Sequence, residues 1–195
     1  TSPVNSAASG TDAIVDDVLA DPAAVVVDGH RRTAPARRPV VAPADGLPWT
    51  EVAVGGPPDA ADAADAAARA LPAWSATPAA DRAAALRAVE SRGELGLSAV
   101  YFQVMADLAE ERQGHVLDAV AGTAHHVEPR PLGVAAVLTP WNFPVSIPAR
   151  KIAPALAAGC TVLFKPSEVA PLSSMVLAAV LDRHLPAGAV NTVLG

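Results

Sequence analysis

Two short motifs place hydrogen-bonding side chains directly after apolar runs, among prolines that restrict the backbone. TPWNFP occupies residues 139–144, and KPSE occupies residues 165–168. In the first motif the amide of Asn142, a neutral hydrogen-bond donor, stands between two aromatic residues. In the second motif an ammonium and a carboxylate stand three residues apart. Each motif also has a structural alternative: the asparagine could shape a turn, and the charged pair could be a surface ion pair.

Lysine is rare in this chain, and its two positions lie near these motifs. Of the 14 basic residues only Lys151 and Lys165 are lysines, and both fall in the last third of the chain. This is either chance or a sign that both sites need a compact ammonium on a flexible stem instead of a planar guanidinium. The single cysteine, Cys160, excludes an internal disulfide and favours a cytoplasmic protein.

The composition excludes several classes of protein. The net charge is −6, and no basic cluster exceeds pairs such as those at 31–32 and 37–38, so nucleic-acid binding is not expected. Apolar stretches are interrupted well before the roughly 18 residues that a membrane span requires, and the N-terminus lacks a signal-peptide pattern. No membrane association and no metal site are predicted. Because 51% of the 195 residues are hydrophobic, the chain can form a core.

The first 130 residues are predicted to form a leader, short strands and helices. Residues 1–24 are a leader, either loose or containing a short helix at 14–19. Residues 25–54 contain extended pieces broken by Gly and Pro, which fit two or three antiparallel edge strands. Three helices are then predicted, at 57–71, 78–92 and 98–113. The third helix is expected to face the core with one side, formed by Tyr101, Val104, Met105 and Leu108.

From residue 131 onward, apolar runs alternate with helical patterns. The predicted strands are 134–139, 160–165 and 190–194, separated by helices at 147–159 and 171–188. Strands that are apolar on both faces and alternate with helices are typical of an α/β fold with a doubly wound parallel sheet. In such sheets ligands bind beyond the carboxyl ends of the strands, which is where TPWNFP and KPSE stand.

Residues 131–195 resemble the early nucleotide-binding segment of NAD(P)-dependent aldehyde dehydrogenases, since PWNFP, PALAAG and KPSE occur in that family's order and spacing. A weaker similarity runs from about residue 25 through PAWSATPAADRAAAL, and residues 114–130 align loosely with the start of the family's oligomerisation hairpin. The stretch between Arg92 and Tyr101 is shorter than the family pattern. The resemblance implies a partial Rossmann-like NAD-binding domain at 25–195. Its leading strands and helices would occupy 25–130, and its βαβαβ cofactor half would occupy 131–195.

The resemblance gives Asn142 the role of the family's oxyanion donor. In that family the side-chain amide of this asparagine donates a hydrogen bond to the oxyanion that forms when a cysteine thiolate attacks an aldehyde. A preorganised neutral donor of this kind lowers the barrier by roughly 3 kcal/mol. The flanking aromatic residues are expected to help exclude water from the site.

The resemblance also defines a cofactor site. Lys165 and Glu168 match the pair that reaches the adenosine ribose hydroxyls, and Ser167 lies in the same motif. Because the carboxylate would repel a 2′-phosphate, NAD is favoured over NADP. The positions that line the family's cofactor cleft or support its hydrogen bonds correspond to Leu138, Thr139, Trp141 and Lys151.

The functional expectation is half of an active site. The family's catalytic cysteine, its general-base glutamate and its phosphate-facing glycine turn all lie C-terminal to this segment, and Cys160 is expected to be a core residue. GELG at 93–96 imitates the glutamate motif but precedes the sheet. The complete enzyme would oxidise an aldehyde with NAD, whereas this chain alone is expected to be inactive. The alternatives are a non-catalytic binding or oligomerisation module and a decayed gene product. Open sheet edges predict self-association, or a partner that carries the missing half.

Overall fold

The computed structural model describes residues 10–20, 24–34, 36–42, 44–92, 97–111, 114–117 and 122–195. Its centre is a five-stranded sheet in the order β2-β1-β9-β8-β7. Three parallel strands form one half: β7 (Val134–Leu138), β8 (Thr161–Lys165) and β9 (Val190–Thr192). Each lies within the predicted strand range, so the predicted α/β fold with a parallel βαβαβ unit is confirmed.

The antiparallel half of the sheet comes from the start of the chain. Strand β1 (Ala24–Val27) pairs antiparallel with β9, where Val26 faces Thr192, and β2 (His30–Thr33) pairs with β1. A second antiparallel pair, β3 (Ala36–Val41) with β4 (Pro48–Val54), forms a separate two-stranded sheet. The sequence predicted antiparallel strands here, but not that two of them extend the parallel sheet.

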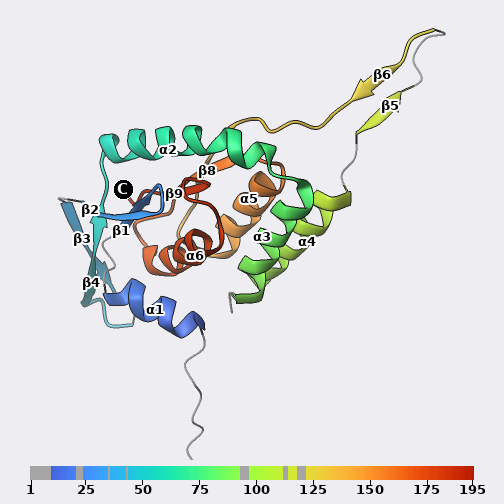
Figure 1. The fold of residues 1–195 in the computed structure, drawn as a ribbon. Helices are drawn as coiled ribbons and strands as arrows, with labels where there is room; N and C mark the ends of the chain where they lie inside the picture. The colour runs from blue at the N-terminus through green and yellow to red at the C-terminus, as the bar shows by residue number, and fades with distance from the viewer. Residues whose placement is uncertain are drawn as a thin grey trace, which may run out of the picture.

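Helices cover both faces of the sheet. Helix α2 (Pro57–Ala76) lies on one side, whereas α5 (Ser146–Ala157) and α6 (Pro171–His184) lie on the other (Figure 1). At the start of α2 the Asp59 carboxylate accepts a hydrogen bond from the backbone N–H of Gly56 at 2.8 Å. The buried residues of α2 are Trp74 near its end and three small residues, Ala63, Ala66 and Ala67, in its middle. The helix therefore approaches closely enough for the Thr161 hydroxyl of β8 to donate to the Ala67 carbonyl at 2.8 Å.

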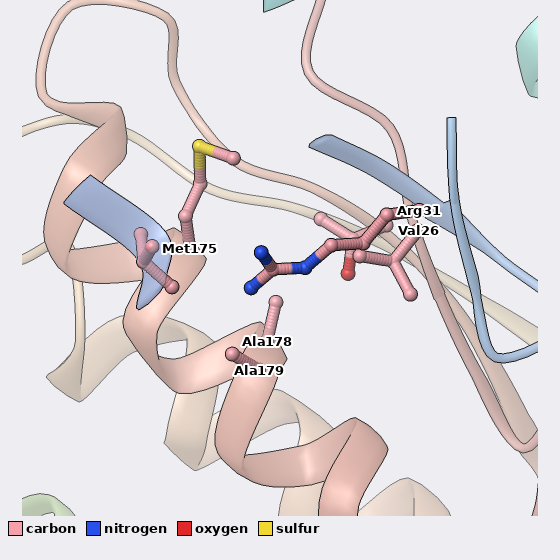
Figure 2. Close-up of a pocket in the computed structure, with 7 residues that line it drawn as sticks. Val26, Arg31, Met175, Ala178 and Ala179 are labelled. Carbon is pink, nitrogen blue, oxygen red and sulfur yellow. The ribbon is translucent and has the colours of Figure 1, made fainter. Parts of the chain in front are cut away.

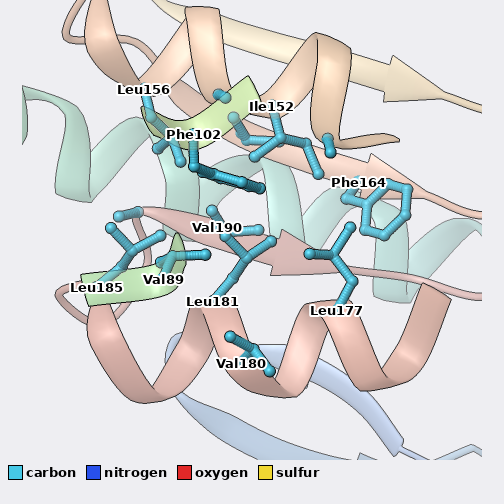
Figure 3. Close-up of a cluster of buried hydrophobic side chains, with 14 of the residues drawn as sticks. Val89, Phe102, Ile152, Leu156, Phe164, Leu177, Val180, Leu181, Leu185 and Val190 are labelled. Carbon is cyan, nitrogen blue, oxygen red and sulfur yellow. The ribbon is translucent and has the colours of Figure 1, made fainter. Parts of the chain in front are cut away.

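The main core lies between the sheet and the helices on the α5–α6 side. In the view of Figure 3, Ile152 of α5 lies above Phe164 of β8, and Leu177 of α6 lies below it. All three side chains are fully buried. Helix α3 (Ala79–Arg92) and helix α4 (Leu97–Glu111) complete the cluster, because α4 packs against α3 and α5.

The predicted core face of α4 is partly wrong. Its buried residues are Ser98, Phe102, Ala106 and Ala109, while Tyr101 and Met105 only border the core and Val104 and Leu108 are exposed. The helix is apolar around most of its circumference, so periodicity alone allowed two faces. The face with the small residues packs inward because alanines let neighbouring helices approach.

The first described segment forms helix α1 (Gly10–Ala20), which is one of the two alternatives predicted for it. Ile14 and Val18 are buried, and α1 packs against α6.

Two short strands, β5 (His115–Leu117) and β6 (His125–Val127), form an antiparallel ribbon that extends away from the body (Figure 1). Among the described residues no strand pairs with the outer side of β7, so this edge of the sheet is open. None of the described helices is long and apolar enough to span a membrane.

Candidate functional site

The two motifs meet at the carboxyl ends of β7 and β8. These strands pair in parallel with Leu138 opposite Lys165. The backbone N–H of Thr139 donates to the Lys165 carbonyl at 3.2 Å and extends the pairing one residue beyond β7. Ligands of parallel α/β sheets bind at this end of the strands. The structure therefore brings TPWNFP and KPSE to one location.

Lys165 and Glu168 form an ion pair there. Lys165 Nζ lies 3.4 Å from Glu168 Oε2, and both side chains remain about one-third exposed. The pKa of the Glu168 carboxyl is lowered, first by a hydrogen bond from its own backbone N–H, then by the nearby Lys165 ammonium and Arg38 guanidinium. Glu168 is therefore ionised at neutral pH. The Ser167 hydroxyl accepts a hydrogen bond from the N–H of Val169 at 3.2 Å, so this side chain shapes the loop that carries Glu168.

A second cation reaches the same carboxylate from a distant part of the chain. Arg38 of β3 places its Nη1 3.6 Å from Glu168 Oε1. The sequence showed Arg38 only as half of a basic pair, with nothing to connect it to KPSE. Its role depends on tertiary placement of the β3–β4 sheet beside the end of β8.

The loop that follows β7 is held by hydrogen bonds outside the motif itself. The Ser174 hydroxyl of α6 is buried and donates to the carbonyl of Pro144, and the N–H of Ile147 donates to the carbonyl of Phe143 at 3.2 Å. Ser174 is a positioning residue that the sequence did not reveal, because a serine in the first turns of a helix has many uses. Asn142 is exposed and forms no hydrogen bond within the described chain.

The aromatic residues beside Asn142 do not shield it. Trp141 is 59% exposed and Phe143 is 60% exposed, so the expected exclusion of water is not present in this chain. Leu138, at the open edge of the sheet, is also exposed. Its neighbour Thr139 is buried, and the Thr139 hydroxyl has no hydrogen-bond partner among the described residues.

The remaining two candidates lie apart from this cluster. Lys151 is exposed on α5, and within the described chain it forms no ion pair or hydrogen bond. Cys160 is a buried free thiol, as expected for a core residue. It precedes β8 and therefore lies at the amino end of that strand, whereas Asn142 follows the carboxyl end of β7. A five-residue strand spans about 16 Å, so this thiol cannot reach a group that binds to Asn142.

A small enclosed cavity lies elsewhere, between α6 and the antiparallel half of the sheet. It is lined by residues that include Val26, Arg31 and Met175, and its volume is about 10 Å³ (Figure 2). That volume fits at most one water molecule. Arg31 also forms an ion pair with Asp17 of α1 at 2.9 Å. The cavity marks where α1 packs onto the body and is too small for a cofactor.

Comparisons with known proteins agree with these features. A model of the aldehyde dehydrogenase family matches residues 30–92 and 87–195. The mitochondrial succinate-semialdehyde dehydrogenase of Mus musculus is 33% identical over 217 aligned positions, which cover 98% of this chain and 41% of that protein. A succinate-semialdehyde dehydrogenase of Escherichia coli (strain K12), whose name specifies NADP(+), is 35% identical over 158 positions, covering 65% of this chain and 32% of that protein.

A solved structure shows the same relationship. PnpE from Pseudomonas sp. WBC-3, solved in complex with nicotinamide adenine dinucleotide, superposes with a TM-score of 0.83 at 34% identity. The match covers 89% of this chain and 41% of that chain. This chain thus spans about two-fifths of the length of PnpE and of the mouse protein.

The aligned region also differs internally. The alignment with the mouse protein has 217 positions, more than the 195 residues of this chain, so the mouse protein contains residues here that this chain lacks. The family model matches in two parts that overlap at residues 87–92, directly before the stretch that was predicted to be short. The family model matches most of this chain, and the chain shares an α/β fold with solved aldehyde dehydrogenases, so this chain belongs to the aldehyde dehydrogenase family.

Proposed function

We propose that this chain supplies the NAD-binding half and the oxyanion donor of an enzyme that oxidises an aldehyde to a carboxylic acid. The observation that carries this proposal is the Lys165–Glu168 pair, which stands beside Thr139 at the carboxyl ends of two parallel strands. In a family member, this is the position at which a nucleotide cofactor binds.

The donor set fits the adenosine ribose of such a cofactor. A carboxylate accepts hydrogen bonds from the two hydroxyls of a vicinal diol, and an ammonium donates to their oxygens. The unpartnered, buried hydroxyl of Thr139 is a polar group that a ligand could satisfy. When bound, NAD would supply the hydride acceptor. Taken by itself, the anionic Glu168 favours NAD over NADP in this proposal, because its negative charge would repel a 2′-phosphate.

Asn142 would act on the aldehyde. Its amide N–H donates to the oxygen that becomes negatively charged when a nucleophile adds to the carbonyl carbon, which stabilises that charge. The hydrogen bond from Ser174 to the Pro144 carbonyl fixes the loop behind it. Leu138 at the end of β7 and Trp141 in this loop are both exposed and would offer apolar surface to the cofactor.

The isolated chain should not oxidise aldehydes. Its single thiol, Cys160, is buried at the opposite end of β8 from the proposed site, so it cannot form the covalent adduct. NADH formation measured with a panel of aldehydes tests this expectation. Turnover that disappears in Cys160→Ala would contradict the assignment of Cys160 to the core.

Cofactor binding tests the proposal directly. Titration of the ¹⁵N-labelled chain with NAD and with adenosine should shift the amide signals of residues 138–142 and 165–168. Lys165→Ala should weaken the binding of both, whereas Lys151→Ala should leave adenosine binding unchanged, because Lys151 lies outside the ribose cluster. Absence of shifts at 165–168 at saturating ligand would refute the ribose site.

A second candidate function is assembly without catalysis. The β5–β6 ribbon extends from the body (Figure 1) and exposes the apolar side chains of Val116, Leu117 and Val127. Together with the open edge of β7, it offers two sites for strand pairing. Size-exclusion chromatography with light scattering tests this candidate. A monodisperse 19.7 kDa species would count against it, whereas a concentration-dependent oligomer would support it. With one cysteine in the chain, the cytoplasm is the proposed compartment.

A further inference from the structure

We propose that Arg38 is a specificity-determining residue of the cofactor site, which offsets the charge of Glu168 and allows the site to accept an adenosine with a 2′-phosphate. This inference rests on the proposed ribose site. It changes what that site would select: NAD and NADP should bind with similar affinity, although the sequence motif alone favours NAD.

The geometry brings two cations to one carboxylate. Each oxygen of Glu168 faces a different partner, Oε2 facing Lys165 at 3.4 Å and Oε1 facing Arg38 at 3.6 Å. Lys165 comes from β8 and Arg38 from the separate β3–β4 sheet. The three side chains therefore form a cluster with a net charge of +1.

The charge balance decides which ligand fits. With Lys165 alone, the ammonium and the carboxylate cancel, so the pair offers no net attraction to a 2′-phosphate with nearly two negative charges. Arg38 adds one positive charge at the same carboxylate. A phosphate then finds two cations against one anion, so the local charge favours its binding.

Arg38 is placed to exchange partners. Its distance to Glu168 is too long for a strong hydrogen bond, and its side chain is about half exposed. The guanidinium is therefore not committed to one geometry, and a planar fork suits two phosphate oxygens at once. The backbone beneath it is fixed, because Val40 on the same face of β3 and the directly paired Val52 of β4 are both buried.

An independent feature points to a polar ligand at this edge. The Thr139 hydroxyl is buried without a hydrogen-bond partner in the described chain, and the backbone of Thr139 is bonded to that of Lys165. Buried polar atoms in folded proteins nearly always have partners. Through that backbone bond Thr139 lies at the same end of the sheet as Lys165.

The experiment compares two small probes, adenosine and adenosine 2′-monophosphate, by NMR titration of the ¹⁵N-labelled chain. Four forms are needed: wild type, Arg38→Met, Arg38→Lys and Arg37→Met. Arg37→Met is the matched control, because it removes the same charge from the adjacent residue of β3. The side chain of Arg37 points to the opposite face of that strand from the side chain of Arg38. The amide signal of Val52 reports whether the β3–β4 sheet stays folded in each variant.

The expected result is selective. Arg38→Met should weaken the binding of adenosine 2′-monophosphate about tenfold, as expected for the loss of a charged hydrogen-bond donor to the phosphate, and should change adenosine binding less than about twofold. Arg38→Lys should keep most of the affinity, and Arg37→Met should change neither probe. The loss in Arg38→Met should also shrink as salt is added, because the contact is exposed.

Two outcomes would overturn the proposal, and they differ. If adenosine binds at 165–168 but Arg38→Met affects both probes equally or neither, Arg38 does not read the 2′-phosphate, while the ribose site stands. If neither probe shifts these signals in any form, the ribose site itself is refuted and the role of Arg38 falls with it.

Discussion

Phe164 and its neighbour Lys165 should respond differently to replacement by alanine. Phe164→Ala should lower the stability of the chain, whereas Lys165→Ala should weaken ligand binding. Phe164 is fully buried in the middle of the sheet, paired with Val137 of β7 and Thr192 of β9. Lys165 is the last residue of β8, and its side chain is partly exposed beside Glu168. One residue should therefore determine stability, and the next should determine ligand binding.

The magnitudes follow from these environments. Removing a buried phenylalanine side chain lowers the free energy of unfolding by about 3–5 kcal/mol, through lost burial and the cavity that remains. In a chain of this size that corresponds to a melting temperature lower by about 6–20 °C. The exposed ion pair of Lys165 contributes less than about 1 kcal/mol to stability. Its loss should nevertheless weaken adenosine binding about tenfold, because a charged hydrogen-bond donor to the ligand disappears.

The assay combines urea denaturation with NMR titration of adenosine. Phe164→Ala should lower the urea midpoint strongly and leave the affinity of the folded molecules unchanged, and Lys165→Ala should do the reverse. If Phe164→Ala does not fold, Phe164→Leu should show a smaller loss with the same pattern. The reasoning is refuted if Lys165→Ala destabilises the chain as much as Phe164→Ala, or if it leaves adenosine affinity unchanged.

Further predictions concern four residues outside the site. Burial raises the pKa of the Asp182 carboxyl above its ordinary value of 3.8, so ionisation of Asp182 lowers the stability of the folded chain as the pH rises above 3.8. Asp182→Asn should therefore raise the melting temperature at pH 7 and should not raise it below pH 3.8. Gly188 has φ +79°, and an added Cβ would lie 2.9 Å from Ala70 Cβ, so Gly188→Ala should cost about 2–4 kcal/mol in urea denaturation. Gly46→Ala, with φ +73° and open space, should cost only about 1–2 kcal/mol. Cys160 should react with a thiol reagent only when the chain unfolds; fast labelling in buffer would show that it is accessible.

Local patterns in the sequence predicted the elements of the parallel half of the fold. Apolar strand patterns and Pro or Gly at helix ends are local signals, and the strands they predicted are present within a few residues. These local signals do not predict which distant strands pair with each other. Val26 of β1 pairs with Thr192 of β9, and nothing in the sequence of either strand identifies the other as its partner.

In the candidate site, too, the features encoded by local motifs were predicted, whereas contacts from distant segments were not. The alternation of apolar runs and helical patterns placed TPWNFP and KPSE at the carboxyl ends of neighbouring strands, and the paired ends of β7 and β8 bring them together. Arg38 and Ser174 were not predicted, because one reaches the site from a separate sheet and the other acts through a backbone carbonyl. The outward direction of Val104 and Leu108 was also missed, since an apolar helix offers more than one face to the core.

The exposure of the loop determines what Asn142 can contribute. An amide aimed at a developing oxyanion lowers the barrier by roughly 3 kcal/mol when the site excludes water, because the local dielectric is low and no water competes. Here Trp141 and Phe143 are more than half exposed, so water reaches the same position. A hydrogen bond that replaces one to water contributes only about 0.5–1.5 kcal/mol. In the proposed function, Asn142 would therefore act at full strength only when another protein surface covers Trp141 and Phe143.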